Sequence, residues 1–206
     1  VHHKKPVLFV GVAGTGKTTI VKDYLAEVKL KSETMMSTSL NLNSYTTSAA
    51  LQAIIMGSLE KRSGHTYGPP GHKQCIYFID DLNMPHVDMY DTQAAIMLMT
   101  QMISYGQVYD RQHLDEKRDI VDVLFTACMN PKAGSFMINA RLQRHFTVLT
   151  TYAPTPTLIS GIYSKILGKH LQSFSSIIHR LTDQIVGATG DILMSIQNSP
   201  SFLPSA

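Results

Sequence analysis

The sequence predicts an α/β protein with a parallel β-sheet that helices cover on both faces. Short apolar segments alternate with longer segments whose apolar residues recur at helical spacing, which is the order typical of parallel sheets. A glycine-rich loop joins the first apolar segment to the first helix. After Pro154 and Pro156 the pattern is helical only. We therefore expect a larger α/β domain over residues 1–153 and a small helical domain over 154–206.

Apolar runs and capping residues set the expected elements. The run 75–79 is continuously apolar, which predicts a strand buried on both faces. Thr47 or Ser48 can cap the helix that follows the second strand. The predicted strands are 7–10, 37–43, 75–79, 121–128 and 146–150. The predicted helices are 18–29, 48–62, 87–105, 138–145, one beginning at 158, and 176–197, and the loop 63–73 is rich in turn residues.

Composition restricts the classes of protein. The 206 residues are 44% hydrophobic and 16% charged, which predicts a globular chain. A net charge of +3 without a long basic run does not favour a nucleic-acid partner, and no apolar stretch is long enough to span a membrane. Cys75 and Cys128 fall in predicted strands and are expected to be reduced, buried thiols. Both ends lack a natural boundary, so we expect a piece of a larger protein.

Residues 11–18 fit G-x-x-x-x-G-K-[ST], the phosphate-binding P-loop. A strand precedes this loop and a helix follows it, so backbone N–H groups and the helix N-terminus can surround phosphate oxygens. Lys17 is expected to reach the β- and γ-phosphates, and the Thr18 hydroxyl is expected to contact Mg²⁺. The alternative is a plain glycine turn with an exposed lysine. The candidate nucleotide-binding residues are Gly11, Ala13, Gly14, Thr15, Gly16, Lys17, Thr18 and Thr19.

The strand 75–79 ends in Asp80-Asp81, which fits a Walker B motif. Ligands bind at the carboxyl ends of such strands, so Asp80 is a candidate Mg²⁺ residue together with Thr18. Asp81 stands where many P-loop ATPases have a catalytic Glu, and its side chain is about 1.5 Å shorter. We therefore expect ATP binding with slow or regulated hydrolysis. The alternative is that both acids only cap the next turn.

Three further residues are candidates for catalysis. Asn130 follows the strand 121–128 and can contact the γ-phosphate or the attacking water, although an Asn before proline also forms turns. Arg141 and Arg144 are three residues apart on a predicted helix, and guanidinium groups stabilise phosphoryl charge. Either arginine could serve a neighbouring module's site, or both could lie on a solvated helix face.

With these motifs placed, the chain resembles an AAA+ module, and more narrowly the third AAA+ module of axonemal dynein heavy chains. The likeness rests on the P-loop, Asp80-Asp81, Asn130, Arg141 and Arg144. Several segments extend it: Tyr-Gly-Pro-Pro-Gly-His-Lys at 67–73, Ile-Tyr-Phe-Ile-Asp-Asp-Leu-Asn-Met-Pro at 76–85, Tyr-Gly at 105–106, Tyr-Asp-Arg at 109–111, Cys-Met-Asn-Pro at 128–131, and 139–146.

The resemblance implies a five-stranded parallel sheet in the order 5-1-4-3-2 and hairpin insertions within 63–73 and 107–119. It implies ATP or ADP with Mg²⁺ as cofactors, Asn130 as a γ-phosphate sensor, and Arg141 with Arg144 facing the preceding module's nucleotide. The implied partners are neighbouring AAA+ modules, microtubules, and dynein intermediate and light chains. The implied location is the cytoplasm, the cytoskeleton and the axoneme of cilia or flagella, where a minus-end-directed motor drives beating.

Two alternatives remain open at this stage. One is a nucleotide-locked structural module without turnover, which the aspartate at 81 favours. The other is an AAA+ remodelling or loader ATPase, for which we find neither a basic stripe nor an aromatic pore loop. The resemblance does not extend to a sensor-2 arginine in the helical domain or to the adenine pocket, which upstream residues normally complete.

Overall fold

The computed structural model describes residues 5–90, 92–131, 138–197 and 199. It divides into two units, residues 1–152 and 153–206, which are treated separately below.

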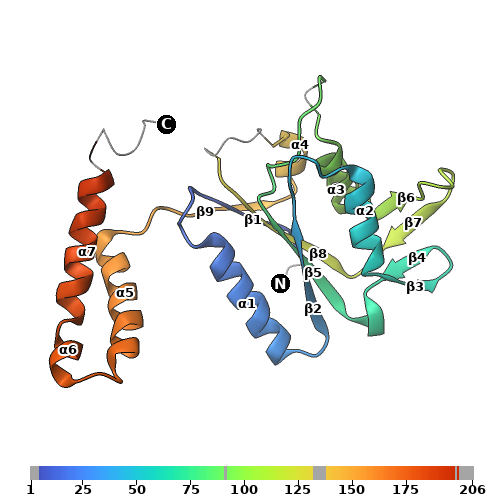
Figure 1. The fold of residues 1–206 in the computed structure, drawn as a ribbon. Coiled ribbons are helices and arrows are strands. Elements are labelled where there is room, and N and C mark those ends of the chain that lie inside the picture. Colours follow the sequence, from blue (N-terminus) through green and yellow to red (C-terminus); the bar gives the residue numbers. More distant parts are fainter. Residues whose placement is uncertain (1–4, 91, 132–137, 198, 200–206) are drawn as a thin grey trace. The chain divides into compact units, whose positions relative to one another are not determined.

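The first unit is built on a five-stranded parallel sheet (Figure 1). Its strands pair in the order β2-β5-β8-β1-β9, which confirms the predicted order read from the other edge. All four pairings are parallel. The strands are β1 (Val7–Val10), β2 (Met35–Asn41), β5 (Gln74–Asp80), β8 (Val123–Met129) and β9 (Thr147–Thr150).

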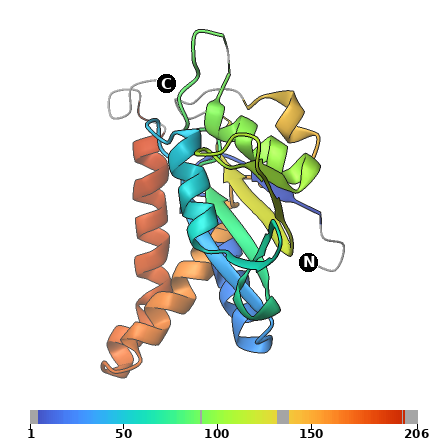
Figure 2. The ribbon, with the colours of Figure 1, turned by 90° about the vertical axis from the view of Figure 1, so that its right-hand side faces the viewer.

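Helices cover both faces of this sheet, as predicted. The helix α1 (Lys17–Lys31) lies on one face, while α2 (Ser48–Gly57) and α3 (Ala94–Tyr105) lie on the other, the side that Figure 2 looks onto. Alternate residues of β5 supply the two cores. Ile76 and Phe78 pack in the cluster that contains α1 residues, whereas Tyr77 and Ile79 belong to the cluster with α2 and α3 residues. This double burial explains why the β5 sequence is continuously apolar.

A second, four-stranded sheet occupies the two regions where the resemblance implied hairpins. It has the order β3-β4-β7-β6. Two antiparallel hairpins, β3–β4 and β6–β7, join through a parallel β4–β7 pairing, so the two insertions form one structure. The bounds are β3 (Glu60–Ser63), β4 (Thr66–Gly68), the short helix η1 (Pro70–His72), β6 (Gln107–Tyr109) and β7 (Lys117–Ile120).

Two predicted helices are shorter than expected. The helix expected over 48–62 ends at Gly57, because residues 60–63 pair with β4 and Arg62 forms an ion pair with Asp122 at 2.5 Å. The helix expected over 87–105 begins only at Ala94. Before it, the Asp88 carboxylate accepts hydrogen bonds from the backbone N–H groups of Tyr90 and Thr92, which holds a turn in place of helix.

The short helix expected over 138–145 is a four-residue helix, α4 (Ala140–Gln143). The Asn139 side chain caps it by accepting from the backbone N–H of Arg141 at 2.9 Å. Residue 144 keeps helical backbone angles at the C-cap, so the predicted helix is present in reduced form.

The second unit contains three helices among its described residues: α5 (Pro156–Leu171), α6 (Ser176–Arg180) and α7 (Thr182–Gln197). Thr155 caps α5 and Pro156 occupies its first position, which is two residues earlier than predicted. The single helix expected over 176–197 is interrupted at Leu181, where the Thr182 hydroxyl donates to the His179 carbonyl at 2.6 Å. Across the described residues, no helix combines the length and apolarity that crossing a membrane requires.

Candidate nucleotide-binding site

The P-loop connects β1 to α1 as the motif predicted. Gly14 and Gly16 both have φ of +78°, a left-handed conformation that glycine adopts without strain. Gly16 is also the N-cap of α1, so the loop leads directly into the helix N-terminus. The sequence therefore folds here into the glycine turn and helix start that suit an anion.

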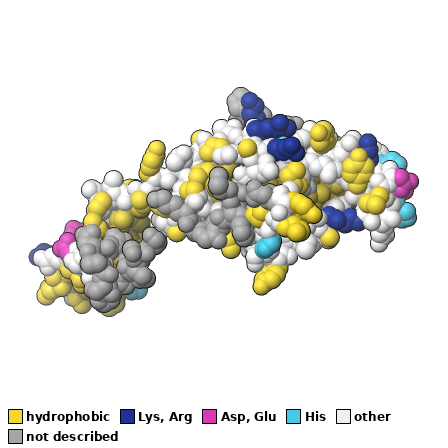
Figure 3. Space-filling view, turned by 90° about the horizontal axis from the view of Figure 1, so that it is seen from above, with side chains coloured by type: hydrophobic (Ala, Val, Ile, Leu, Met, Phe, Trp, Pro, Cys, Tyr) yellow, Lys and Arg dark blue, Asp and Glu magenta, His cyan; other side chains and the backbone are white. Residues whose placement is uncertain are grey.

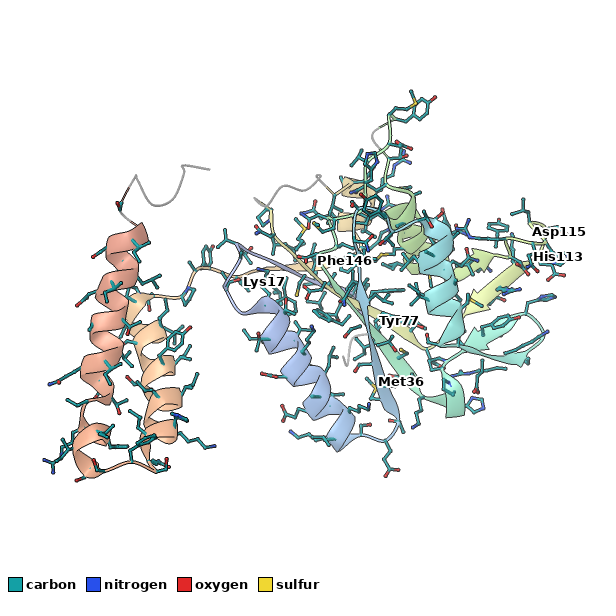
Figure 4. All side chains as sticks on the ribbon, viewed as in Figure 1. Lys17, Met36, Tyr77, His113, Asp115 and Phe146 are labelled. Carbon is teal, nitrogen blue, oxygen red and sulfur yellow. The ribbon has the colours of Figure 1, made fainter. Side chains whose placement is uncertain are left out.

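The Lys17 side chain is folded into this loop. It begins α1, as Figure 4 shows, and is only 9% exposed. Its Nζ donates to the Val12 carbonyl at 2.8 Å and to the Thr15 hydroxyl at 3.2 Å. Both of these partners are uncharged. A buried ammonium group gains most from anionic partners, so phosphate oxygens are better ligands for Lys17 than the atoms that hold it here.

The metal-site candidates also meet. The Thr18 hydroxyl donates to Asp80 Oδ1 at 3.0 Å, although 62 residues separate them in the sequence. A hydroxyl and a carboxylate side by side form an all-oxygen donor set, which fits Mg²⁺. When bound, Mg²⁺ would neutralise phosphate charge at this point.

The end of β8 connects the P-loop with the loop that follows β5. Its Met129 carbonyl accepts from the Gly11 N–H at 3.2 Å, and its Cys128 carbonyl accepts from the Leu82 N–H at 3.0 Å. Just beyond, the half-buried Asn130 accepts through its backbone carbonyl from Asn83 Nδ2 at 2.9 Å. Asn130 therefore lies at the same sheet edge as the P-loop and Asp80.

Asp81 differs from Asp80 in its surroundings. Asp80 ends β5 and is half-buried, whereas Asp81 is exposed and has φ of +52°. Aspartate and asparagine are the residues besides glycine that enter this left-handed region most readily. Aspartate therefore suits the left-handed backbone at position 81 better than the longer glutamate would.

Burial and charge act on the thiol beneath the site. Cys128 is 1% exposed, and this burial together with the negative charge of Asp80 raises its pKa to about 12, although Lys17 acts in the opposite direction. The thiol is thus neutral at neutral pH. Cys75 is likewise buried, and burial raises the pKa of its thiol.

The two candidate arginines lie on the surface of the first unit. Arg141 is on α4 and Arg144 follows it, and both are exposed. Arg144 Nε donates to His145 Nε2 at 3.3 Å. On the face drawn in Figure 3, one group of Lys and Arg side chains is visible at the top, and other Lys and Arg side chains lie separately. The arginines are thus accessible to a neighbouring molecule or module.

Sequence reasoning missed two residues of this site. Asn83, three positions after Asp80, ties the Asp80-Asp81 turn to the end of β8. Its position as a polar residue soon after the Walker B acids could have identified Asn83 from the sequence. Thr151, which lies directly after β9, contacts the P-loop through Thr15 at 3.2 Å. That contact joins residues 136 positions apart, so no local sequence pattern predicts it.

A parallel sheet with a P-loop after its inner strand β1, a hydroxyl–carboxylate pair at the β5 end and the order β2-β5-β8-β1-β9 defines an AAA+ type P-loop protein. The chain belongs to the dynein motor-region family, since the family described as "P-loop containing dynein motor region" matches residues 1–154.

Individual relatives agree with this family. The chain is 40% identical over 206 residues to "Dynein beta chain, flagellar outer arm" of Chlamydomonas reinhardtii, with 100% of the chain covered. It is 44% identical over 204 residues, 98% of the chain, to "Dynein beta chain, ciliary" of Tripneustes gratilla. It is 48% identical over 169 residues, 82% of the chain, to "Dynein axonemal heavy chain 9" of Homo sapiens. In each case the match spans 4% of the relative's length.

Proposed function

We propose that this chain is the third AAA+ module of an axonemal dynein heavy chain and binds ATP or ADP together with Mg²⁺. The observation that carries the proposal is the 3.0 Å hydrogen bond between Thr18 and Asp80 beside the buried Lys17. It brings a P-loop hydroxyl and a Walker B carboxylate to one point, where a metal-bound triphosphate needs them. The module number rests on the segments quoted from the sequence, not on the fold.

Each site residue has a role in this proposal. Lys17 exchanges the Val12 carbonyl and the Thr15 hydroxyl for the β- and γ-phosphates, while Thr18 and Asp80 hold the metal. The backbone N–H groups of residues 11–19 surround the phosphates. Asn130 contacts the γ-phosphate, and Asp81 orients the attacking water.

The exposed arginines act on another site. Arg141, with Arg144, extends toward the nucleotide of the preceding module, where a guanidinium group stabilises charge on the transferred phosphoryl group. Loss of the γ-phosphate from this site would release Asn130 and the arginine that the neighbouring module contributes, so hydrolysis would loosen the interface between modules.

Regulation is a better description of this module than fast turnover. Asp81 is shorter than glutamate by about 1.5 Å, and a misplacement of about 1 Å can cost about 100-fold in rate. The second candidate function is a nucleotide-locked module with no turnover of its own. The exposed, left-handed Asp81 favours it, because a residue in this conformation is suited to the turn whether or not it activates water.

The wider context is also a proposal, since the chain corresponds to 4% of its relatives' length. The relatives' names place them in flagellar outer arms, cilia and axonemes. We infer the same cytoskeletal location here, within a minus-end-directed microtubule motor that drives beating. The partners would be neighbouring AAA+ modules, microtubules through the intact motor, and intermediate and light chains, with no nucleic acid and no membrane.

The test is nucleotide labelling of this site in the intact heavy chain. A photoreactive ATP analogue with Mg²⁺ should label the P-loop peptide of the wild type, and Lys17→Ala should lower that labelling about 10- to 100-fold, the value of lost charged hydrogen bonds. The matched control is Lys29→Ala, an exposed lysine in the last turn of α1, which should label like the wild type. Equal labelling of Lys17→Ala and wild type would refute the proposed site.

A further inference from the structure

Thr151 links the P-loop to the segment between the two units. It directly follows β9 and directly precedes Tyr152, the last residue of the first unit. Its backbone N–H donates to the Val10 carbonyl at 2.7 Å, and its hydroxyl lies 3.2 Å from the Thr15 hydroxyl. The chain therefore passes from a phosphate-loop contact into the connection to α5 within a few residues.

The approach of Thr151 to the loop is close because Gly11 has no side chain. A β-carbon on Gly11 would lie 2.1 Å from Thr151 Oγ1 and 2.5 Å from its carbonyl oxygen. The first glycine of the P-loop thus makes room for this threonine as well as for phosphate. The two segments fit each other, which a chance surface contact would not require.

The hydroxyl groups of Thr15 and Thr151 form a hydrogen-bonded chain in which each hydroxyl has one proton to donate. Thr15 donates to the Val12 carbonyl at 3.0 Å and accepts from Lys17 Nζ at 3.2 Å. The Thr151 hydroxyl has a single proton and two acceptors within reach, the Val10 carbonyl at 3.3 Å and Thr15 Oγ1 at 3.2 Å. Thr15 Oγ1 can accept two hydrogen bonds, but it is a stronger acceptor for Thr151 when the cationic Lys17 is not already bound to it.

We propose that Thr151 is a positioning residue that reports occupancy of the phosphate site to residues 152–155. The proposal rests on the proposed nucleotide function. When Lys17 turns to phosphate, Thr15 loses that donor, and the Thr151 hydroxyl turns from the Val10 carbonyl to Thr15. The new hydrogen bond ties the start of the inter-unit segment to a loop that phosphate has made rigid.

Hydrogen exchange resolved by peptide tests this in the intact heavy chain, with and without MgATP. In the wild type, MgATP should slow exchange both in the P-loop peptide and at the amides of Tyr152 and Ala153, the latter by about fivefold, because the new hydrogen bond ties this segment to a loop that phosphate has made rigid. Thr151→Val removes the hydroxyl at nearly constant shape and should keep the P-loop response but lose the response at 152–153. Thr151→Ser keeps the hydroxyl and should retain both responses.

Thr15→Val removes the other end of the same hydrogen bond, so this variant should also lose the response at 152–153. It replaces Thr151→Val in the test if Thr151→Val does not fold. A response at 152–153 that persists in both valine variants overturns the relay while leaving nucleotide binding intact. A wild type whose P-loop peptide is insensitive to MgATP overturns the proposed function itself.

Discussion

Thr18 Oγ1 and Asp80 Oδ1 lie 3.0 Å apart although they belong to segments that flank β8 on opposite sides. The register explains how they meet. Val10 is level with Met129, and Ile79 is level with Ala127, so β1, β8 and β5 end at one edge. The carboxyl ends of parallel strands are where ligands bind in such folds. The two residues therefore depend on β8 to set their separation.

Removal of the Thr18 hydroxyl should weaken metal-dependent nucleotide binding. Thr18→Val keeps the branched shape but removes the contact with Asp80, leaving the carboxylate without this donor. We expect about 10- to 100-fold weaker MgATP binding at this site, the loss that charged hydrogen bonds predict. Labelling of the P-loop peptide at graded MgATP measures it.

Thr18→Ser is the matched control for that experiment, because serine keeps the hydroxyl. Its affinity should stay close to the wild type. Binding in EDTA should differ little between Thr18→Val and Thr18→Ser if the hydroxyl acts through the metal. A comparable loss in EDTA would instead assign Thr18 a structural role.

Gly11→Ala should disrupt the P-loop more than a typical glycine substitution. The added β-carbon would lie within 2.5 Å of the Thr151 carbonyl oxygen, a backbone atom that cannot rotate away. Overpacking of this kind costs about 1–3 kcal/mol. Faster hydrogen exchange at both the P-loop and the end of β9 would show it. Gly57→Ala, at the end of α2, meets nothing within 4 Å and should leave exchange in both segments unchanged.

Asp81→Glu should distinguish slow turnover from a locked site. Glutamate restores about 1.5 Å of reach toward an attacking water, which predicts faster hydrolysis of ATP at this site. The φ of +52° opposes the change, since a longer side chain is less suited to this conformation, at a cost of about 1 kcal/mol. Radiolabelled ATP trapped at this site is followed through one motor cycle. If the wild type and Asp81→Glu both retain all of the bound ATP unhydrolysed, the locked module is favoured.

Local patterns predicted the main sheet and most of the site. Apolar runs, and an alternation over 37–43, identified the five strands. The P-loop and Asp80-Asp81 are contiguous motifs, so their meeting at one edge followed from parallel topology. The four-stranded insertion sheet was not predicted as a sheet. Residues 60–63 read Glu-Lys-Arg-Ser, without an apolar alternation, and their sheet is completed by a parallel β4–β7 pairing about fifty residues away.

Single side chains account for the other differences. Asp88 binds the backbone of the residues that follow it and delays the start of α3. Thr151 reaches Thr15 across 136 positions. The Thr151 contact depends on tertiary structure, which periodicity and motif spacing do not report. The Asp88 contacts are local, but they are side-chain to backbone bonds that apolar periodicity does not register.

Cys128 should resist alkylation while the protein is folded. Burial and the charge of Asp80 raise the pKa of its thiol to about 12, and the thiolate is the reactive form. Iodoacetamide at pH 8 should therefore label Cys128 of the intact heavy chain only after denaturation, and Cys75, whose thiol pKa is also raised, should behave in the same way. Rapid native labelling of Cys128 would contradict the burial described here.

The same shift predicts an alkaline loss of stability. In the unfolded chain the Cys128 thiol ionises near pH 9, whereas in the fold it stays neutral up to about pH 12. The folded state is therefore disfavoured as pH rises from 9 toward 12, by at most about 4 kcal/mol, while below pH 9 this term is absent. Cys128→Ser removes the titrating group, because a hydroxyl stays neutral in this range. Its β8 segment should lose less protection against proteolysis between pH 8 and pH 10.5 than that of the wild type, and an equal loss would assign the alkaline effect to other groups.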